Sequence, residues 1–423
     1  MPQPFVVILG KAVRYAARLR GGGSALPGLF VERISPNFTK DTLSTLPKGV
    51  VIISGTNGKT TTTKMVVALL ESQGMKVFTN RTGSNFARGV AAALLGDIDM
   101  KGHLDADIAV LELDEAHAVK FVQVIPPRYS LLLNIMRDQL DRFGEIDATA
   151  KMLQAIAQAT TESVVLNRED RRILAIKDTL ESQQINFFGL SDELLSTFPS
   201  DDDLHNAQVA SSTRPEATVI LKKYTDDTAT FSIGGKDHTT TLKLRGIYNV
   251  FNSAAALALT AAITGDQLDE DALFSALATV TPAFGRGEQL EVGGQPLELV
   301  LVKNPSGFRL GLQSFSPKGY ATMIAINDNY ADGRDMSWLW DVDFATLASE
   351  GVAQVSGIRA YDMAIRLQYD EVPITHIEAD LASALRQFIQ HNKDQPKRIY
   401  CTYTAMLALR KELSKITNVE VIS

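Results

Sequence analysis

The residues from 55 to 61 carry the groups that bind a nucleoside triphosphate. Two glycines allow backbone N–H groups to approach phosphate oxygens, a lysine ammonium reaches the β- and γ-phosphates, and a threonine hydroxyl can ligate Mg²⁺. An apolar run at 49–54 precedes this stretch and a helical pattern at 60–74 follows it, which is the strand–loop–helix context of a P-loop. The usual signature has four residues between its glycines, whereas here only Thr56 and Asn57 separate them. The alternative is a glycine-rich turn that binds nothing. We predict that ATP is bound by Gly55, Thr56, Asn57, Gly58, Lys59, Thr60 and Thr61, with Lys59 also catalytic and Thr60 a metal ligand.

Composition restricts the class of protein. The chain has 423 residues, 45% hydrophobic and 22% charged, as expected of a globular protein with two or three domains. Its net charge of −7 argues against broad nucleic-acid binding. The single cysteine, Cys401, excludes an internal disulfide and a multi-cysteine zinc site, and it fits a reducing compartment.

Strands and helices alternate after residue 48, which predicts a parallel sheet covered by helices on both faces. Strands are expected at 49–54, 76–79, 108–113, 129–134 and 163–166, with helices between them. We assign 1–48 to an N-terminal arm, 49–288 to an ATP-binding middle domain with a small β insertion at about 195–240, and 289–423 to a C-terminal α/β domain. In the last domain the pattern predicts strands at 297–302, 320–326, 357–360 and 398–401.

The first residues form an apolar run followed by basic side chains: Lys11, Arg14, Arg18 and Arg20. A secretory signal has its charge before the apolar run, so we predict an amphipathic helix up to Arg20 and an irregular, extended path after it. A role at a membrane surface is the weaker alternative. The sequence has no run of 18 apolar residues, so we predict no transmembrane helix.

The shortened phosphate loop resembles that of the Mur ligases and folylpolyglutamate synthases. This resemblance implies that ATP phosphorylates a carboxylate and that an amine then attacks the acyl phosphate. It implies Mg²⁺ binding by Glu112, at the end of a strand, although a helix-capping acid is the alternative. Gln139 stands where related enzymes place a second metal-binding histidine, which leaves a second Mg²⁺ open. Asn249 and Asn252 match residues that contact adenine, with an N-cap role as the alternative. Arg286 matches an arginine that reaches the ATP phosphates and acts in catalysis.

Further stretches, at 81–85, 137–142, 303–308, 327–344 and 403–406, resemble the MurT family over essentially the whole chain. The phosphate loop lies too near the start of the sequence to leave room for the UDP-binding N-terminal domain of other Mur ligases. The resemblance implies a cytoplasmic ligase that amidates the D-glutamate α-carboxyl of the lipid II stem peptide. Its ammonia would come from a GatD-type glutaminase partner, and its substrate would lie at the inner face of the membrane. A stand-alone ligase and a nucleotide-dependent scaffold are the competing hypotheses.

The family resemblance also implies that one aspartate of the last domain completes the active site of the partner. We choose Asp335, with Asp332 and Asp341 as alternatives that the sequence does not separate. Cys401 lies in a predicted buried strand and is interpreted as structural. Relatives often carry a four-cysteine zinc ribbon in the insertion, but this insertion has no cysteine, and His205 and His238 cannot replace one. We therefore predict no zinc.

Overall fold

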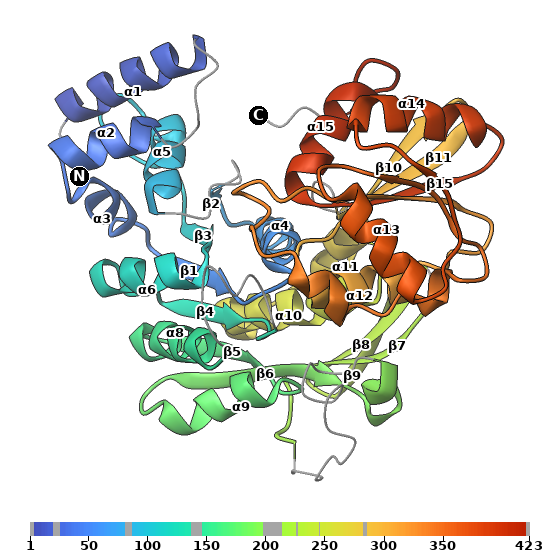
Figure 1. Cartoon of the computed structure of the whole chain (residues 1–423). Helices are drawn as coiled ribbons and strands as arrows, with labels where there is room; N and C mark the ends of the chain where they lie inside the picture. Colours follow the sequence, from blue (N-terminus) through green and yellow to red (C-terminus); the bar gives the residue numbers. More distant parts are fainter. Residues whose placement is uncertain are drawn as a thin grey trace.

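The described residues form two β-sheets, one before residue 286 and one that begins with it (Figure 1). The computed structural model describes residues 4–19, 26–80, 87–136, 146–197, 214–225, 227–244, 246–281 and 286–419. The motifs at 81–85 and 137–142, including Gln139, and the residue His205 lie outside these ranges.

The first sheet has nine strands in the order β2-β3-β1-β4-β5-β6-β7-β8-β9. The strands from β2 to β7 run parallel, which confirms the predicted parallel sheet, and the last two pairings are antiparallel. Their bounds are Val50–Ser54 (β1), Val77–Thr79 (β2), Ile108–Glu112 (β3), Tyr129–Leu132 (β4), Ser163–Asn167 (β5), Gln184–Leu190 (β6), Val219–Tyr224 (β7), Thr228–Ile233 (β8) and Lys236–Thr241 (β9). The strands of the expected β insertion, β7 to β9, are not separate from this sheet. Strand β7 pairs with β6, and its buried Val219 and Leu221 join the main core, so the insertion extends the sheet.

Helices cover both faces of this sheet, so its central strands are buried on both sides. Val51 and Ile53 of β1 face one core, whereas Val50 and Ile52 face the other. The first face is covered by α4 (Lys59–Ser72), α10 (Ile247–Thr264) and α11 (Glu270–Thr279). The second is covered by α5 (Ala87–Asp97), α6 (Glu115–Val124), α8 (Ile146–Ala159) and α9 (Arg171–Ala175). Among the described residues, α10 with the turn after it is long and apolar enough to cross a membrane, but 72% of that window is buried, so α10 is a core helix.

The described residues before β1 form packed helices. The helix expected up to Arg20 is confirmed by α1, whereas the irregular, extended path expected after it is wrong. Helices α1 (Pro4–Leu19), α2 (Leu26–Ile34) and α3 (Phe38–Leu43) pack beside α5 (Figure 1). The side chains of Val7, Val31 and Phe38 are fully buried in the second core. Pro27, which suggested an irregular path, lies in the first turn of α2, where no intrahelical N–H bond is lost.

The second sheet has six strands in the order β10-β11-β15-β12-β13-β14. They are Arg286–Val292 (β10), Gln295–Leu301 (β11), Ala321–Ala325 (β12), Val352–Ser356 (β13), Ile374–Ile377 (β14) and Lys397–Cys401 (β15). Helices α12 (Pro305–Ser314) and α13 (Ala360–Tyr369) cover one face, and α14 (Leu381–His391) and α15 (Tyr403–Leu413) cover the other. The predicted strand at 357–360 is wrong. Gly357 has φ +95° in a turn against the Ile326 carbonyl, and α13 begins three residues later.

Candidate active site

The phosphate loop connects β1 to α4, as the sequence predicted, and it requires glycine at both ends. Gly55 has φ +132° and Gly58 has φ +88°, conformations that side chains disfavour. The loop is fixed by β4 and the residues after it. The Asn57 N–H donates to Asn134 Oδ1 at 2.9 Å, and Asn134 Nδ2 donates back to the Asn57 carbonyl at 3.0 Å. The Thr56 hydroxyl accepts from the Met136 N–H at 3.0 Å. The loop is thus held open at the amino end of α4, where the helix dipole favours an anion.

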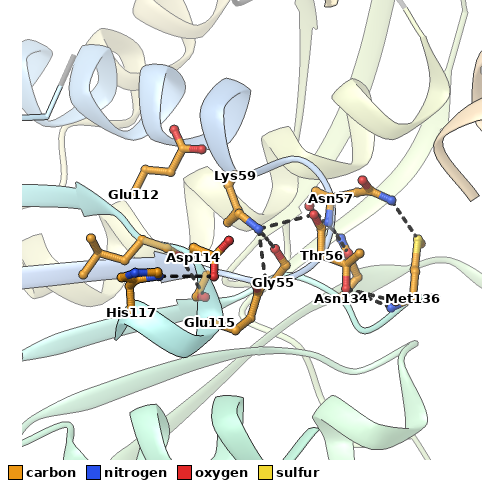
Figure 2. Close-up of polar contacts among 12 residues, drawn as sticks. Gly55, Thr56, Asn57, Lys59, Glu112, Asp114, Glu115, His117, Asn134 and Met136 are labelled. Carbon is orange, nitrogen blue, oxygen red and sulfur yellow. Dashed lines mark hydrogen bonds and ion pairs between the residues drawn. The ribbon is translucent and has the colours of Figure 1, made fainter. Parts of the chain in front are cut away.

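Lys59 is buried and its charge is paired. Its ammonium donates to the Gly55 carbonyl at 2.5 Å and forms an ion pair of 3.0 Å with Glu115 at the start of α6. Figure 2 shows this ammonium between the loop and the Glu115 carboxylate. Both side chains are nearly inaccessible to solvent, at 7% and 4%. Sequence reasoning missed Glu115, although an acid three residues beyond the end of a strand beside β1 was the available signal.

Thr60 and Glu112, the two predicted Mg²⁺ ligands, contact each other beside the phosphate loop. The Thr60 hydroxyl donates to Glu112 Oε1 at 2.8 Å, and Glu112 is the last residue of β3, which is next to β1 in the sheet. A hydroxyl and a carboxylate are oxygen ligands of the kind that Mg²⁺ takes together with phosphate oxygens and water. No cluster of three acidic, histidine or cysteine side chains suited to a metal occurs in the described ranges. Thr61 is fully buried, and its hydroxyl has no hydrogen-bond partner among the described residues, so its contact with a phosphate stays a prediction.

A cleft between the two domains adjoins the loop, and the predicted adenine residues line it. Asn252 packs directly on the loop, because a Cβ added to Gly58 would lie 2.4 Å from Asn252 Nδ2. Asn249 lies one turn earlier on α10. The lining comes from the loop and from both domains: Asn57, Gly58, Asn134, Gly246, Tyr248, Asn249, Asn252, Val300, Leu301, Lys303, Gly307, Leu310, Gly311, Ser314 and Phe315. Amide groups beside apolar side chains suit a base such as adenine.

The C-terminal domain contacts the loop through Asn304, which caps α12. Asn304 Nδ2 donates to Asn57 Oδ1 at 3.2 Å, and Asn304 Oδ1 accepts from the Gly307 N–H at 2.6 Å. The neighbouring Lys303 lines the same cleft. Neither was in the predicted site. Arg286 begins β10, but its side chain lies outside the described residues, so its role in phosphate binding stays a prediction.

The three candidate aspartates have different environments. Asp332 is buried, and its carboxylate accepts from the Thr404 N–H at 2.7 Å and from the Thr404 hydroxyl. Burial raises the pKa of Asp332 above its ordinary value. Asp335 is exposed, and hydrogen bonds from the Ser337 hydroxyl and N–H lower its pKa. Asp341 is also exposed. Asp332 therefore fixes a loop, whereas Asp335 and Asp341 can meet another protein.

Comparison with known proteins identifies the family. Residues 53–260 match the family described as Mur ligase middle domain, and residues 301–406 match MurT ligase C-terminal. The chain is 31% identical to lipid II isoglutaminyl synthase (glutamine-hydrolyzing) subunit MurT of Streptococcus pneumoniae, over 96% of both chains. It is 28% identical to the subunit of that name from Staphylococcus aureus, over 91% of this chain and 92% of the relative. The chain belongs to the MurT family. It is thus a Mur ligase-type, ATP-dependent ligase of peptidoglycan synthesis, and the MurT name denotes one subunit of a synthase.

Solved structures agree with this MurT assignment at the level of the fold. A pseudomurein peptide ligase type C from Methanothermus fervidus superposes with a TM-score of 0.68 at 16% identity, over 90% of this chain and 80% of that one. MurF ligase from Thermotoga maritima in complex with ADP gives 0.66 at 18% identity, over 90% and 84%. The fold is therefore that of Mur ligases, as the sequence predicted.

Proposed function

We propose that this chain is the ATP-using subunit of a lipid II isoglutaminyl synthase. In this reaction, the α-carboxylate of D-glutamate in the lipid II stem peptide attacks the γ-phosphorus of ATP, giving an acyl phosphate and ADP. Ammonia then attacks the acyl carbon and phosphate leaves, which gives D-isoglutamine. The observation that carries the proposal is a complete phosphate loop facing a C-terminal domain of MurT type, in a chain that aligns with MurT subunits from end to end.

The residues of the loop have distinct tasks in this chemistry. The backbone N–H groups at the start of α4 and the Lys59 ammonium bind and orient the phosphates. Thr60 and Glu112 would hold Mg²⁺, which neutralises charge that develops on the phosphate oxygens. The Asn249 and Asn252 amides would orient adenine, and Arg286 would reach the phosphates from the C-terminal domain. Glu115 keeps the Lys59 ammonium at the loop before ATP arrives.

The ammonia must come from outside this chain. Glutaminases use a reactive cysteine thiolate, and the single cysteine, Cys401, is fully buried in β15. Its burial raises the pKa of the thiol, so the thiolate does not form at neutral pH. This agrees with the structural role predicted for Cys401. We propose a GatD-type glutaminase as the source.

We place this partner against the surface around Asp335. Asp335 accepts the Ser337 N–H at the start of a short 3-10 helix, η4 (Ser337–Asp341), which carries Trp340. Trp340 is 52% exposed, and its ring meets that of Tyr369, which is 76% exposed, at 5.6 Å. Exposed aromatic side chains beside an exposed carboxylate are typical of a protein interface. Asp335 is the residue we propose to enter the active site of the partner, with Asp341 as its rival.

Reconstitution with the glutaminase, lipid II, ATP and Mg²⁺ tests the proposal, with either glutamine or free ammonium as the nitrogen donor. We expect Lys59→Met to abolish amidation with both donors. Asp335→Asn should abolish it with glutamine and preserve it with ammonium. Asp341→Asn is the matched variant. If it shows the donor-dependent loss and Asp335→Asn does not, the assignment passes to Asp341. Absence of amidated product from both folded wild-type proteins, or addition of an amino acid without the partner, would refute the proposed reaction.

A further inference from the structure

The outer face of α1 is apolar, although the helix already buries another apolar face. Val6 and Val7 are buried, and a Cβ added to Gly10 would lie 2.6 Å from Val31 of α2. On the opposite side Phe5, Ile8 and Tyr15 are 70%, 50% and 68% exposed. The other exposed positions among the described side chains of α1 are Pro4, Ala12 and Ala16. A helix that is apolar on both sides has a second surface to cover.

The spacing shows that these side chains form one stripe. Residues 5, 8, 12 and 15 follow each other at three- and four-residue intervals, which places them on one side of a helix. Isolated exposed apolar residues are common on soluble proteins. Three large ones along a single helix, with no charged residue among the exposed positions of its described side chains, are a continuous patch. In Figure 1 this helix lies at the edge of the molecule, beyond α2 and α5.

The charge of this part of the sequence points to the occupant of the stripe. Lys11, Arg14, Arg18 and Arg20 precede Glu32, which is the first acidic residue of a chain with a net charge of −7. The Lys11 ammonium donates to the Ile98 carbonyl at 2.6 Å, and Arg14 lies against Gly96, so both extend from the side of α1 toward the end of α5. An apolar stripe in a segment that has four basic residues and no acidic one before Glu32 matches the interface of an anionic lipid bilayer. A second copy of this surface would meet like charge.

We propose that α1 binds this protein to an anionic phospholipid surface, with Phe5, Ile8 and Tyr15 entering the interfacial region and the net positive charge of this segment attracting the anionic headgroups. This deepens the proposed function, since lipid II is anchored in such a surface. The binding itself does not depend on that function. A membrane-bound enzyme would search for its substrate in the plane of the membrane.

Sedimentation of the full chain with lipid vesicles tests the binding. The vesicles contain phosphatidylcholine alone or a mixture with phosphatidylglycerol. We expect binding to the mixed vesicles, weakening with salt. The variant Phe5→Gln/Ile8→Gln/Tyr15→Gln should reduce it at least about tenfold. The matched control is Tyr361→Gln/Ile365→Gln/Tyr369→Gln on α13, which removes side chains that are 66%, 57% and 76% exposed. It should bind the vesicles as the wild type does.

Three results would overturn the proposal: equal binding by the α1 variant, equal loss in the α13 variant, or no preference for anionic vesicles. If the wild type forms a dimer and the α1 variant does not, the stripe would instead serve self-association. If the α1 variant no longer binds the glutaminase, the stripe would instead be the contact surface for that partner. ATP affinity and the unfolding temperature of the α1 variant should match those of the wild type. Amidation should fall for lipid II in vesicles and persist for a detergent-dispersed analogue. If neither substrate is amidated by the wild type, the proposed reaction fails while the vesicle result still decides the membrane proposal.

Discussion

The buried ion pair between Lys59 and Glu115 allows a quantitative test of how the site is built. With side-chain exposures of 7% and 4%, neither charge has water to replace its partner. Removing one member of a buried pair typically costs about 3–5 kcal/mol, whereas removing both costs much less. We expect Glu115→Gln to lower the free energy of unfolding by about 3 kcal/mol, the lower end of this range, because the glutamine carbonyl can still accept one hydrogen bond. Lys59→Met should cost a similar amount.

The double variant Lys59→Met/Glu115→Gln completes the cycle. The decrease in its free energy of unfolding should be smaller than the sum of the decreases in the two single variants, by at least about 2 kcal/mol. Urea unfolding followed by far-UV circular dichroism measures each value. The exposed pair Arg128–Glu162, at 2.5 Å with exposures of 35% and 41%, is the control, and Glu162→Gln should cost only about 0–1 kcal/mol.

ATP supplies a further readout of the same pair. Glu115→Gln keeps Lys59, so ATP with Mg²⁺ should stabilise this variant more than the wild type, because the phosphates replace the missing negative charge. Two results would refute the reasoning. One is a loss of unfolding free energy in the double variant that equals the sum of the two single losses. The other is a loss for Glu115→Gln that is no larger than the loss for Glu162→Gln.

Three more predictions concern the loop and the two domains. Gly58→Ala should abolish ATP binding in calorimetry, because its Cβ meets Asn252, while Gly235→Ala, with φ +82° and open space, should leave it intact. Asp332→Asn should lower the unfolding free energy by about 1–3 kcal/mol, whereas Asp335→Asn should change it by less than about 0.5 kcal/mol. Burial raises the pKa of Asp170 from 3.8 to about 6. The native state therefore holds this proton more tightly than the unfolded state does. Because of this carboxyl, the free energy of unfolding should fall by roughly 3 kcal/mol as the pH rises from about 4 to about 6. Asp170→Asn should remove this part of the pH dependence in urea unfolding at the two pH values.

Local pattern was sufficient for the loop and for most of the sheet around it. The phosphate loop, its flanking strand and helix, and the place of Glu112 at the end of β3 all follow from residues close together in the sequence. The metal-binding role of Glu112 was implied by the family resemblance. The groups that hold the loop come from far away. Glu115, Asn134 and Asn304 lie 56, 77 and 247 residues from their partners. No periodicity links such positions. The place of Glu115 just after a strand was a local signal, but only the fold shows which partner each of these residues meets.

Two errors in the predicted elements arose from residues with more than one local use. Pro27 suggested an irregular path, but a proline fits the first turn of a helix, and the apolar positions around it are buried. Residues 357–360 contain a glycine and apolar neighbours that fit a strand, but Gly357 ends β13 in a turn. In both cases two conformations were locally acceptable, and contacts in the folded chain decided between them.

The two exposed apolar surfaces lie on different domains, and this separation matters for the proposed reaction. Helix α1, which carries the stripe on its outer face, packs through its other face with α2 and α5 of the middle domain (Figure 1). Trp340 and Tyr369 belong to the C-terminal domain. A membrane and a glutaminase can therefore be bound at the same time, with the phosphate loop and the interdomain cleft between them. If both proposals hold, the α1 and α13 triple variants should affect different measurements. The first should reduce vesicle binding without loss of the glutaminase, and the second should release the glutaminase from a protein that still binds vesicles. A variant of either surface that reduces both would show that the two surfaces act through one interface, contrary to this arrangement.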